Sequence, residues 1–153
     1  GTVFKLYLPC DTESAGAVTS EDSGLIKGSG TVLIIDDDAT ILLNLGEMLA
    51  RLGYAVIPAS GGKEGADIYR KRGGDIDLVI CDIIMPEIDG IETIKLLKNI
   101  RSDVRVIISS GFHNEELSGK LFEMNIAGFM QKPFKMDTLS RLIHSVLKGE
   151  EKG

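Results

Sequence analysis

The stretch TVLIIDDDATILLNLGEMLARLG, residues 31–53, contains the two patterns that decide the fold of this chain. Residues 32–35 are an apolar run that ends in three aspartates, which is typical of a strand covered on both faces. Leucines then recur at spacings of three and four, which predicts an amphipathic helix with Gly53 as its C-terminal cap. These leucines are Leu42, Leu45, Leu49 and Leu52. The stretch therefore predicts one strand followed by one helix.

This unit recurs along the chain. Short apolar runs alternate with segments of helical period, and the last segment shows that period at Leu139, Ile143 and Val146. The apolar runs are residues 32–35, 54–57, 78–80, 104–108 and 127–130. Right-handed crossovers then predict an α/β fold, a flavodoxin-like doubly wound five-stranded parallel sheet with strand order 2-1-3-4-5 and five helices. Pro58 cannot donate a ladder hydrogen bond, so the second strand is expected at an edge.

The domain boundaries follow from composition. A chain of 153 residues is too short for two full domains, and residues 31–149 contain all the repeating units. Residues 10–30 are rich in Gly, Ser, Thr, Asp and Glu, which predicts a flexible linker. Residues 1–9 alternate like a strand that a proline closes, and residues 150–153 form a tail.

Bulk composition excludes several classes of function. A net charge of -6 argues against a nucleic-acid-binding surface. No apolar stretch approaches the ~20 residues that a membrane span requires, so no membrane contact by this segment is expected. The 2 cysteines have neither metal-ligand spacing nor the density of a disulfide scaffold. This segment is expected in the cytoplasm, whether its parent protein is free or attached to a membrane.

Polar side chains stand where the predicted strands end. Residues 36–38 are aspartates after the first strand, Asp82 ends the third, Ser110 ends the fourth and Lys132 follows the fifth. The carboxyl ends of parallel strands meet at one edge of a sheet, so these groups should converge. Carboxylates at close range repel one another unless a cation lies between them, and a set of oxygen donors favours Mg²⁺.

The same groups suit phosphoryl chemistry. A carboxylate nucleophile can attack phosphorus only when the charge on the phosphoryl oxygens is neutralised, which requires a metal ion, an ammonium and a hydroxyl or amide donor around them. The four strand ends supply all of these. The sequence therefore predicts a Mg²⁺ site at which Asp82 accepts a phosphoryl group.

In order and type, these motifs resemble those of the receiver domains of bacterial response regulators. The matching segments are Ile34-Ile35-Asp36-Asp37, Cys81 to Pro86 with Asp89-Gly90, Ser110 followed by a small residue, and Lys132-Pro133-Phe134. The resemblance begins at Thr31 and runs to the last predicted helix. Each motif alone is weak, but the combination is specific.

The resemblance implies a role for each site residue. Asp82 would be the phosphoacceptor, and Lys132 and Ser110 would contact the phosphoryl oxygens. The metal ligands that it implies are Asp37, Asp82, the main-chain carbonyl of Ile84, and Asp36 through water. Ser110 and Phe129 would form the switch that reports phosphorylation to the face made by the fourth helix, fifth strand and fifth helix.

The resemblance also implies partners. The donor would be a phosphohistidine, on the parent kinase or on a histidine phosphotransfer protein, and a receiver homodimer is a further partner. Residues 1–9 resemble the last strand of a histidine kinase ATP-binding domain, which points to a hybrid sensor histidine kinase as the parent. The segment itself would then be an acceptor that takes up and loses the phosphoryl group, within a parent that is a transferase.

Two alternatives compete with this interpretation. Residues 34–40 fit the nucleophile motif of haloacid dehalogenase-like phosphatases, with Asp36 as the nucleophile. That family places its second acidic site after the lysine, whereas Asp82 precedes Lys132, and the chain has no room for a cap domain. A flavodoxin-like binding module would need a phosphate loop after the first strand, where acids stand instead.

Overall fold

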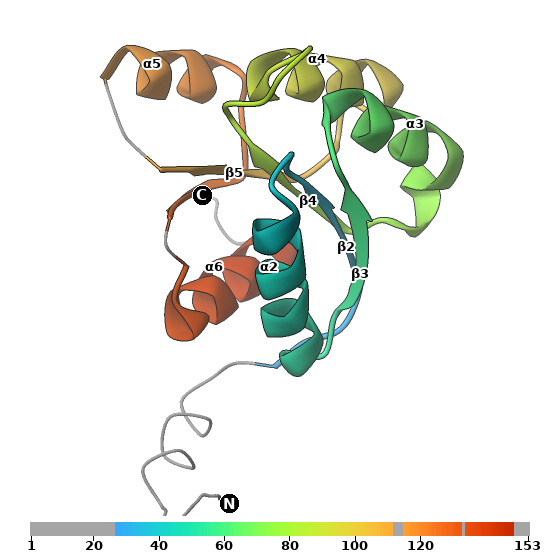
Figure 1. Ribbon diagram of the computed structural model, residues 1–153, viewed down its shortest axis with the longest axis vertical. Helices are drawn as coiled ribbons and strands as arrows, with labels where there is room; N and C mark the ends of the chain where they lie inside the picture. Colours follow the sequence, from blue (N-terminus) through green and yellow to red (C-terminus); the bar gives the residue numbers. More distant parts are fainter. Residues whose placement is uncertain (1–26, 112–114, 133, 149–153) are drawn as a thin grey trace, which may run out of the picture.

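The computed structural model describes residues 27–111, 115–132 and 134–148. Five parallel strands form one sheet, and helices cover both of its faces (Figure 1). The strands are β2 (Thr31–Ile35), β3 (Ala55–Ala59), β4 (Leu78–Asp82), β5 (Val106–Ser110) and β6 (Gly128–Gln131). The helices are α2 (Ala39–Arg51), α3 (Gly62–Arg72), α4 (Gly90–Ile100), α5 (Glu115–Glu123) and α6 (Met136–Lys148), with a 3₁₀ turn at Gly73–Asp75. The predictions for residues 1–9, 10–26 and 149–153 fall outside these described residues.

The strand order is β3-β2-β4-β5-β6, which is the predicted order 2-1-3-4-5. Pro58 lies on β3, an edge strand, so the prediction from proline is confirmed. The predicted fold class is confirmed as well. The predicted apolar runs differ from the observed strands by one or two residues at several ends: β3 is Ala55–Ala59 instead of residues 54–57, and β5 begins at Val106 instead of Val104. The N–H of Val104 donates to the carbonyl of Arg101 at 3.2 Å, which keeps this residue in the turn after α4.

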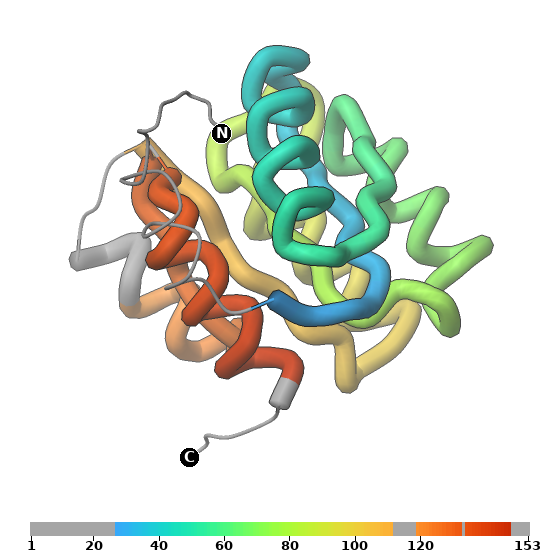
Figure 2. The backbone as a smooth tube through the Cα atoms, turned by 90° about the horizontal axis from the view of Figure 1, so that it is seen from below, coloured from blue at the N-terminus to red at the C-terminus, as the bar shows by residue number. Residues whose placement is uncertain are grey.

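Two apolar layers lie between the sheet and the helices. Helices α2 and α6 are neighbours in both views although they stand at opposite ends of the domain sequence (Figures 1 and 2). Leu45 and Leu49 of α2 share a cluster with Leu139 and Ile143 of α6, as the leucine pattern predicts. Helices α3, α4 and α5 contribute to a second cluster on the other face. The sheet is therefore buried on both sides, which explains why its central strands carry no alternating pattern.

The residues just before β2 pack against the domain. The N–H of Gly28 donates to the carbonyl of Leu52 at 2.9 Å, and the N–H of Ala55 donates to the carbonyl of Gly30 at 2.8 Å. A side chain at position 28 would collide with the hydroxyl of Tyr54, and Gly53 has a positive φ of 103°. We call residues 27–30 the entry clasp, because they hold the incoming chain at the end of α2.

Among the described residues, no helix could cross a membrane, because the longest have 13 residues and a bilayer span needs ~20.

The start of α4 provides a test of how tightly the sheet edge is packed. A Cβ at Gly90 would collide with the carbonyl oxygen of Asp82 and lie 2.7 Å from the Cα of Ile83. Because both neighbours are backbone and cannot move aside, we expect Gly90→Ala to lower the free energy of unfolding by about 3 kcal/mol. Urea denaturation would measure this loss.

The matched control is Gly119→Ala on α5, where an added Cβ meets nothing within 4 Å. This change should leave stability unchanged or raise it by up to ~1 kcal/mol through helix propensity. Equal stabilities of the two variants would contradict the close packing at Gly90.

Candidate functional site

Three carboxylates meet at the carboxyl edge of the sheet. Strands β2 and β4 are adjacent, with Ile35 paired to Cys81, so Asp36 and Asp82 follow side by side. One carboxylate oxygen each of Asp36, Asp37 and Asp82 lies within 4.8 Å of the others. Asp36 and Asp82 are only 2% and 6% exposed, whereas Asp37 faces solvent. This arrangement puts buried negative charge next to an open side.

The turn after β2 separates the three consecutive aspartates. The N–H of Asp38 donates to Oδ1 of Asp36 at 2.9 Å, which fixes the buried carboxylate. Asp38 itself caps α2, because its Oδ1 accepts the N–H of Thr40 at 2.9 Å. The main-chain N–H of Asp36 donates to the carbonyl of Ala59 on the edge strand. One aspartate is thus buried in the site, one borders solvent and one starts a helix.

Lys132 bridges the two buried carboxylates. Its Nζ lies 3.0 Å from Oδ2 of Asp36 and 3.1 Å from Oδ1 of Asp82. Its main-chain N–H donates to the carbonyl of Ser110 at 2.8 Å, so β5 holds the start of the lysine side chain. The sequence placed Lys132 near Asp82 but did not indicate that it also pairs with Asp36.

The charges in this cluster are not balanced, because one ammonium serves two carboxylates. Burial raises the pKa of Asp82, the charge of Asp36 raises it further, and the contact with Lys132 only partly offsets these effects. Burial by itself would lower the pKa of Lys132, but the hydrogen bonds and charges of Asp36 and Asp82 outweigh it and raise that pKa. The site therefore favours additional positive charge.

The remaining predicted site residues lie around this cluster. Ser110 is fully buried at the end of β5, and Phe129 of β6 is half-buried against the layer that contains α3, α4 and α5. Strand register places Ile108 beside Phe129, so Ser110, two residues further on, is on the same face as Phe129. Ile84 lies in the turn after β4 and is 58% exposed. The predicted switch pair, Ser110 and Phe129, and the acid cluster thus lie on opposite faces of the sheet, at its carboxyl end.

The donor set fits a hard divalent cation. All three side chains offer carboxylate oxygens, and Mg²⁺ prefers oxygen ligands while keeping several waters. The exposed side chain of Asp37 leaves room for such waters. The present partner of Asp36 and Asp82, the Lys132 ammonium, carries only one positive charge.

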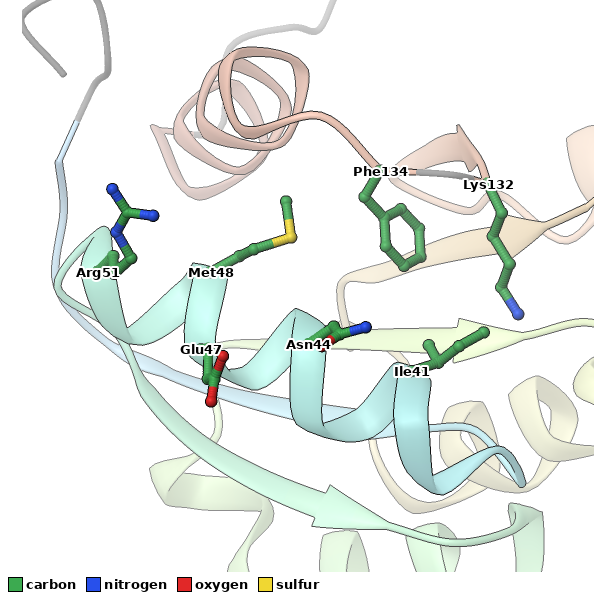
Figure 3. Close-up of a pocket in the computed structure, with 7 residues that line it drawn as sticks. All are labelled: Ile41, Asn44, Glu47, Met48, Arg51, Lys132 and Phe134. Carbon is green, nitrogen blue, oxygen red and sulfur yellow. The ribbon is translucent and has the colours of Figure 1, made fainter. Parts of the chain in front are cut away.

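A groove of about 640 Å³ leads away from this cluster along α2 (Figure 3). Ile41, Met48 and Phe134 supply its apolar side chains, with Lys132 at one end and Arg51 at the other. Asn44 and Glu47 add polar atoms on the helix side. The sequence did not predict this groove, although Ile41 and Met48 continue the leucine stripe on one side and make the apolar face of the helix wider than the leucines alone.

Comparisons with known proteins agree with this geometry. The family model for the response regulator receiver domain matches residues 32–144. The sensor kinase CckA of Brucella abortus is 29% identical over 160 residues, which cover 99% of this chain but 17% of the kinase. The chemotaxis protein CheY of Treponema pallidum is 31% identical over 118 residues, or 76% of this chain and 82% of CheY. The chain therefore spans about a sixth of one relative and most of the other.

Solved structures give the same result. A receiver domain protein from Clostridium thermocellum has a TM-score of 0.74 and 29% identity, covering 78% of this chain and 94% of that one. A chain in the crystal structure of a CheX–CheY–BeF₃–Mg²⁺ complex from Borrelia burgdorferi has a TM-score of 0.73 and 28% identity, covering 82% of this chain and 92% of that one.

These matches do not favour the haloacid dehalogenase alternative. The acid cluster, the lysine that bridges it, the strand order and the family match over residues 32–144 lead to one conclusion: the chain belongs to the family of response regulator receiver domains.

Proposed function

We propose that this receiver domain accepts a phosphoryl group from a phosphohistidine onto the carboxylate of Asp82, with Mg²⁺ as cofactor. The observation that carries the proposal is the buried carboxylate of Asp82 held 3.1 Å from the Lys132 ammonium inside a cluster of three acids. Such a group is a nucleophile with its charge-neutralising partner already in place.

The residues would divide the chemistry as follows. A carboxylate oxygen of Asp82 forms the new O–P bond, the N–P bond of the phosphohistidine breaks, and the freed imidazole nitrogen takes a proton from solvent. The residues that would hold Mg²⁺ are Asp37, Asp82, Ile84 through its main-chain carbonyl, and Asp36 through water. When bound, the ion supplies positive charge to the phosphoryl oxygens.

Lys132 and Ser110 would contact the other phosphoryl oxygens. Lys132 would exchange one of its carboxylate partners for a phosphoryl oxygen, and its ammonium would stay close to negatively charged groups. Ser110 would move toward the phosphoryl group, and because it shares a sheet face with Phe129, its movement would change the space available to that ring. The change would then reach the surface made by α5, β6 and α6.

The groove along α2 supports a protein as the phosphoryl donor. It ends at Lys132, so a partner seated in it lies next to Asp82. Its apolar side chains suit the apolar face of a helix from a partner protein. No described residue of this chain occupies the groove. We propose a phosphohistidine-bearing domain of the parent kinase, or a histidine phosphotransfer protein, as that partner.

The parent protein that we propose is a hybrid histidine kinase. The alignment with the sensor kinase CckA covers 99% of this chain, and so extends over the residues before the receiver domain. This supports the interpretation of residues 1–9 as the end of a kinase catalytic domain and of residues 10–30 as its linker. The BeF₃ and Mg²⁺ in the described CheX–CheY complex support the proposed chemistry in a related fold.

Asp82→Asn is the direct test. The amide keeps the shape of the side chain but is not a nucleophile, so the variant should fold and take up no phosphoryl group from acetyl phosphate and Mg²⁺. Intact-mass measurement and peptide mapping would show one added phosphoryl group on wild type, at Asp82. Modification of wild type at Asp36 instead would favour the dehalogenase-like mechanism.

A second prediction concerns the metal. Because Mg²⁺ binds only the folded state, it should stabilise the domain by ~2.7 kcal/mol at a concentration 100 times its Kd. Asp37→Ala should abolish this effect by removing a ligand. Thermal unfolding with and without Mg²⁺ measures both quantities.

The control for this experiment is Asp75→Ala, which removes the same charge from an exposed site in the 3₁₀ turn before β4. It should keep the full Mg²⁺ effect. An undiminished effect in Asp37→Ala would rule out the proposed ligand set.

The third prediction concerns pH in metal-free buffer. The pKa of Asp82 is raised in the folded protein, so the stability associated with its proton is complete below the unfolded pKa and is lost as the pH rises through the folded pKa. Asp82→Asn cannot lose a proton there. The melting temperature of the variant minus that of wild type should therefore increase from about pH 4 to neutral pH. A difference that is constant over this range would contradict the raised pKa.

A further inference from the structure

Ser109 differs from the other buried serine and threonine residues in the described part of the chain. The described chain buries six polar residues: Asp36, Asp82, Thr93, Ser109, Ser110 and Ser140. Thr93 donates to the carbonyl of Asp89 at 2.8 Å, and Ser140 donates to the carbonyl of Asp137 at 3.0 Å. Ser109 is 2% exposed, yet among the described residues no hydrogen bond reaches its hydroxyl.

Such a hydroxyl is costly in an ordinary core. A buried donor without a partner costs about 1–3 kcal/mol, and an apolar side chain at this place in a sheet covered on both faces would avoid the loss. Ser109 therefore suggests that a polar group comes to this position in some functional state.

Strand register shows which group is nearest. Asp82 pairs with Ser109, and Ser109 pairs with Met130, so the three lie in one row across adjacent parallel strands. Residues paired in this way project to the same face, at the ~4.8 Å spacing of neighbouring strands. Two residues before each of them stand Ile80, Ile107 and Gly128, and both isoleucines belong to the α2–α6 layer. Ser109 is therefore beside Asp82 on the face of the acid cluster.

The lysine of the site crosses this strand. Lys132 lies two residues after Met130, on the same face, and its Nζ reaches Asp82 on β4 and Asp36 beyond β2. Strand β5 lies between β4 and β6, so the lysine side chain passes over the end of β5, where Ser109 is located. In the present state Lys132, and not Ser109, supplies the side-chain hydrogen bond to Asp82.

We propose that Ser109 is a positioning residue for phosphoryl transfer: its hydroxyl donates a hydrogen bond to the Asp82 carboxylate when Lys132 leaves that group for the phosphoryl oxygens. This role rests on the proposed function. The serine keeps its own proton, and no bond to it forms or breaks. Its hydrogen bond holds the carboxylate oxygen that is not attacking, so the nucleophilic oxygen stays aimed at phosphorus.

The test uses three variants in two comparisons: wild type with Ser109→Ala, and Ser109→Thr with Ser109→Val. Ser109→Ala removes the hydroxyl, and Ser109→Thr and Ser109→Val have the same shape but only threonine has a hydroxyl. The quantities to measure are the rate constant for phosphorylation of Asp82 by acetyl phosphate at saturating Mg²⁺, the Kd for Mg²⁺, and the melting temperature without Mg²⁺.

We expect wild type to react about 2–10-fold faster than Ser109→Ala, and Ser109→Thr faster than Ser109→Val by a similar factor, which corresponds to one net hydrogen bond. The Kd for Mg²⁺ should change less than twofold in all of them. Ser109→Ala should melt at the same or a higher temperature, because the hydroxyl that it removes has no hydrogen-bond partner among the described residues. A purely structural role could not slow the reaction while raising stability.

Ser140→Ala is the matched control, since it removes a buried hydroxyl that has a partner on α6. It should lower the melting temperature and leave the phosphorylation rate unchanged. If wild type is modified at Asp82 but reacts as fast as Ser109→Ala, and Ser109→Thr reacts as fast as Ser109→Val, only the role of Ser109 is overturned. A wild type that takes no phosphoryl group at Asp82 would overturn the proposed function and this role with it.

Discussion

The sharing of one ammonium by two buried carboxylates is the interaction on which the site depends. Asp36 and Asp82 lie at adjacent strand ends, and Lys132 contacts both within 3.1 Å. Removing one member of a buried charge group usually destabilises a protein strongly, because the remaining charge has no compensation. The fold thus keeps a cluster with more negative than positive charge, and this imbalance favours an additional cation at the site.

Much of the fold could be predicted from the sequence because the relevant patterns are local. Leu45 and Leu49 define a helix face by spacing alone, and Pro58 marks an edge strand by its missing N–H. The start of β5 was misplaced because Val104 is as apolar as the strand residues that follow it. Its N–H donates to the carbonyl of Arg101 and not to a neighbouring strand, and apolar patterns do not record such bonds.

The candidate site could be predicted in outline for a topological reason. The carboxyl ends of parallel strands meet at one edge of a sheet, so Asp82 and Lys132 were expected near each other whichever rotamers their side chains adopt. The bond from Lys132 to Asp36 spans 96 residues and depends on side-chain rotamers, which no pattern encodes. The position of Ser109 could have been predicted from the sequence, since counting alternate residues along β5 puts it on the same face as Asp82. It was not predicted, because the neighbouring Ser110 matched the motif and was assigned the role.

The entry clasp has a consequence for how this domain can be moved between proteins. The family match begins at Val32 and β2 begins at Thr31, yet the N–H of Gly28 and the carbonyl of Gly30 already bond to the α2–β3 turn. A chimera joined at Thr31 would lose the glycines whose backbone pairs with Leu52 and Ala55, and a residue other than glycine at position 28 would collide with Tyr54. The transferable module therefore includes Gly28, and fusions should be joined before that residue.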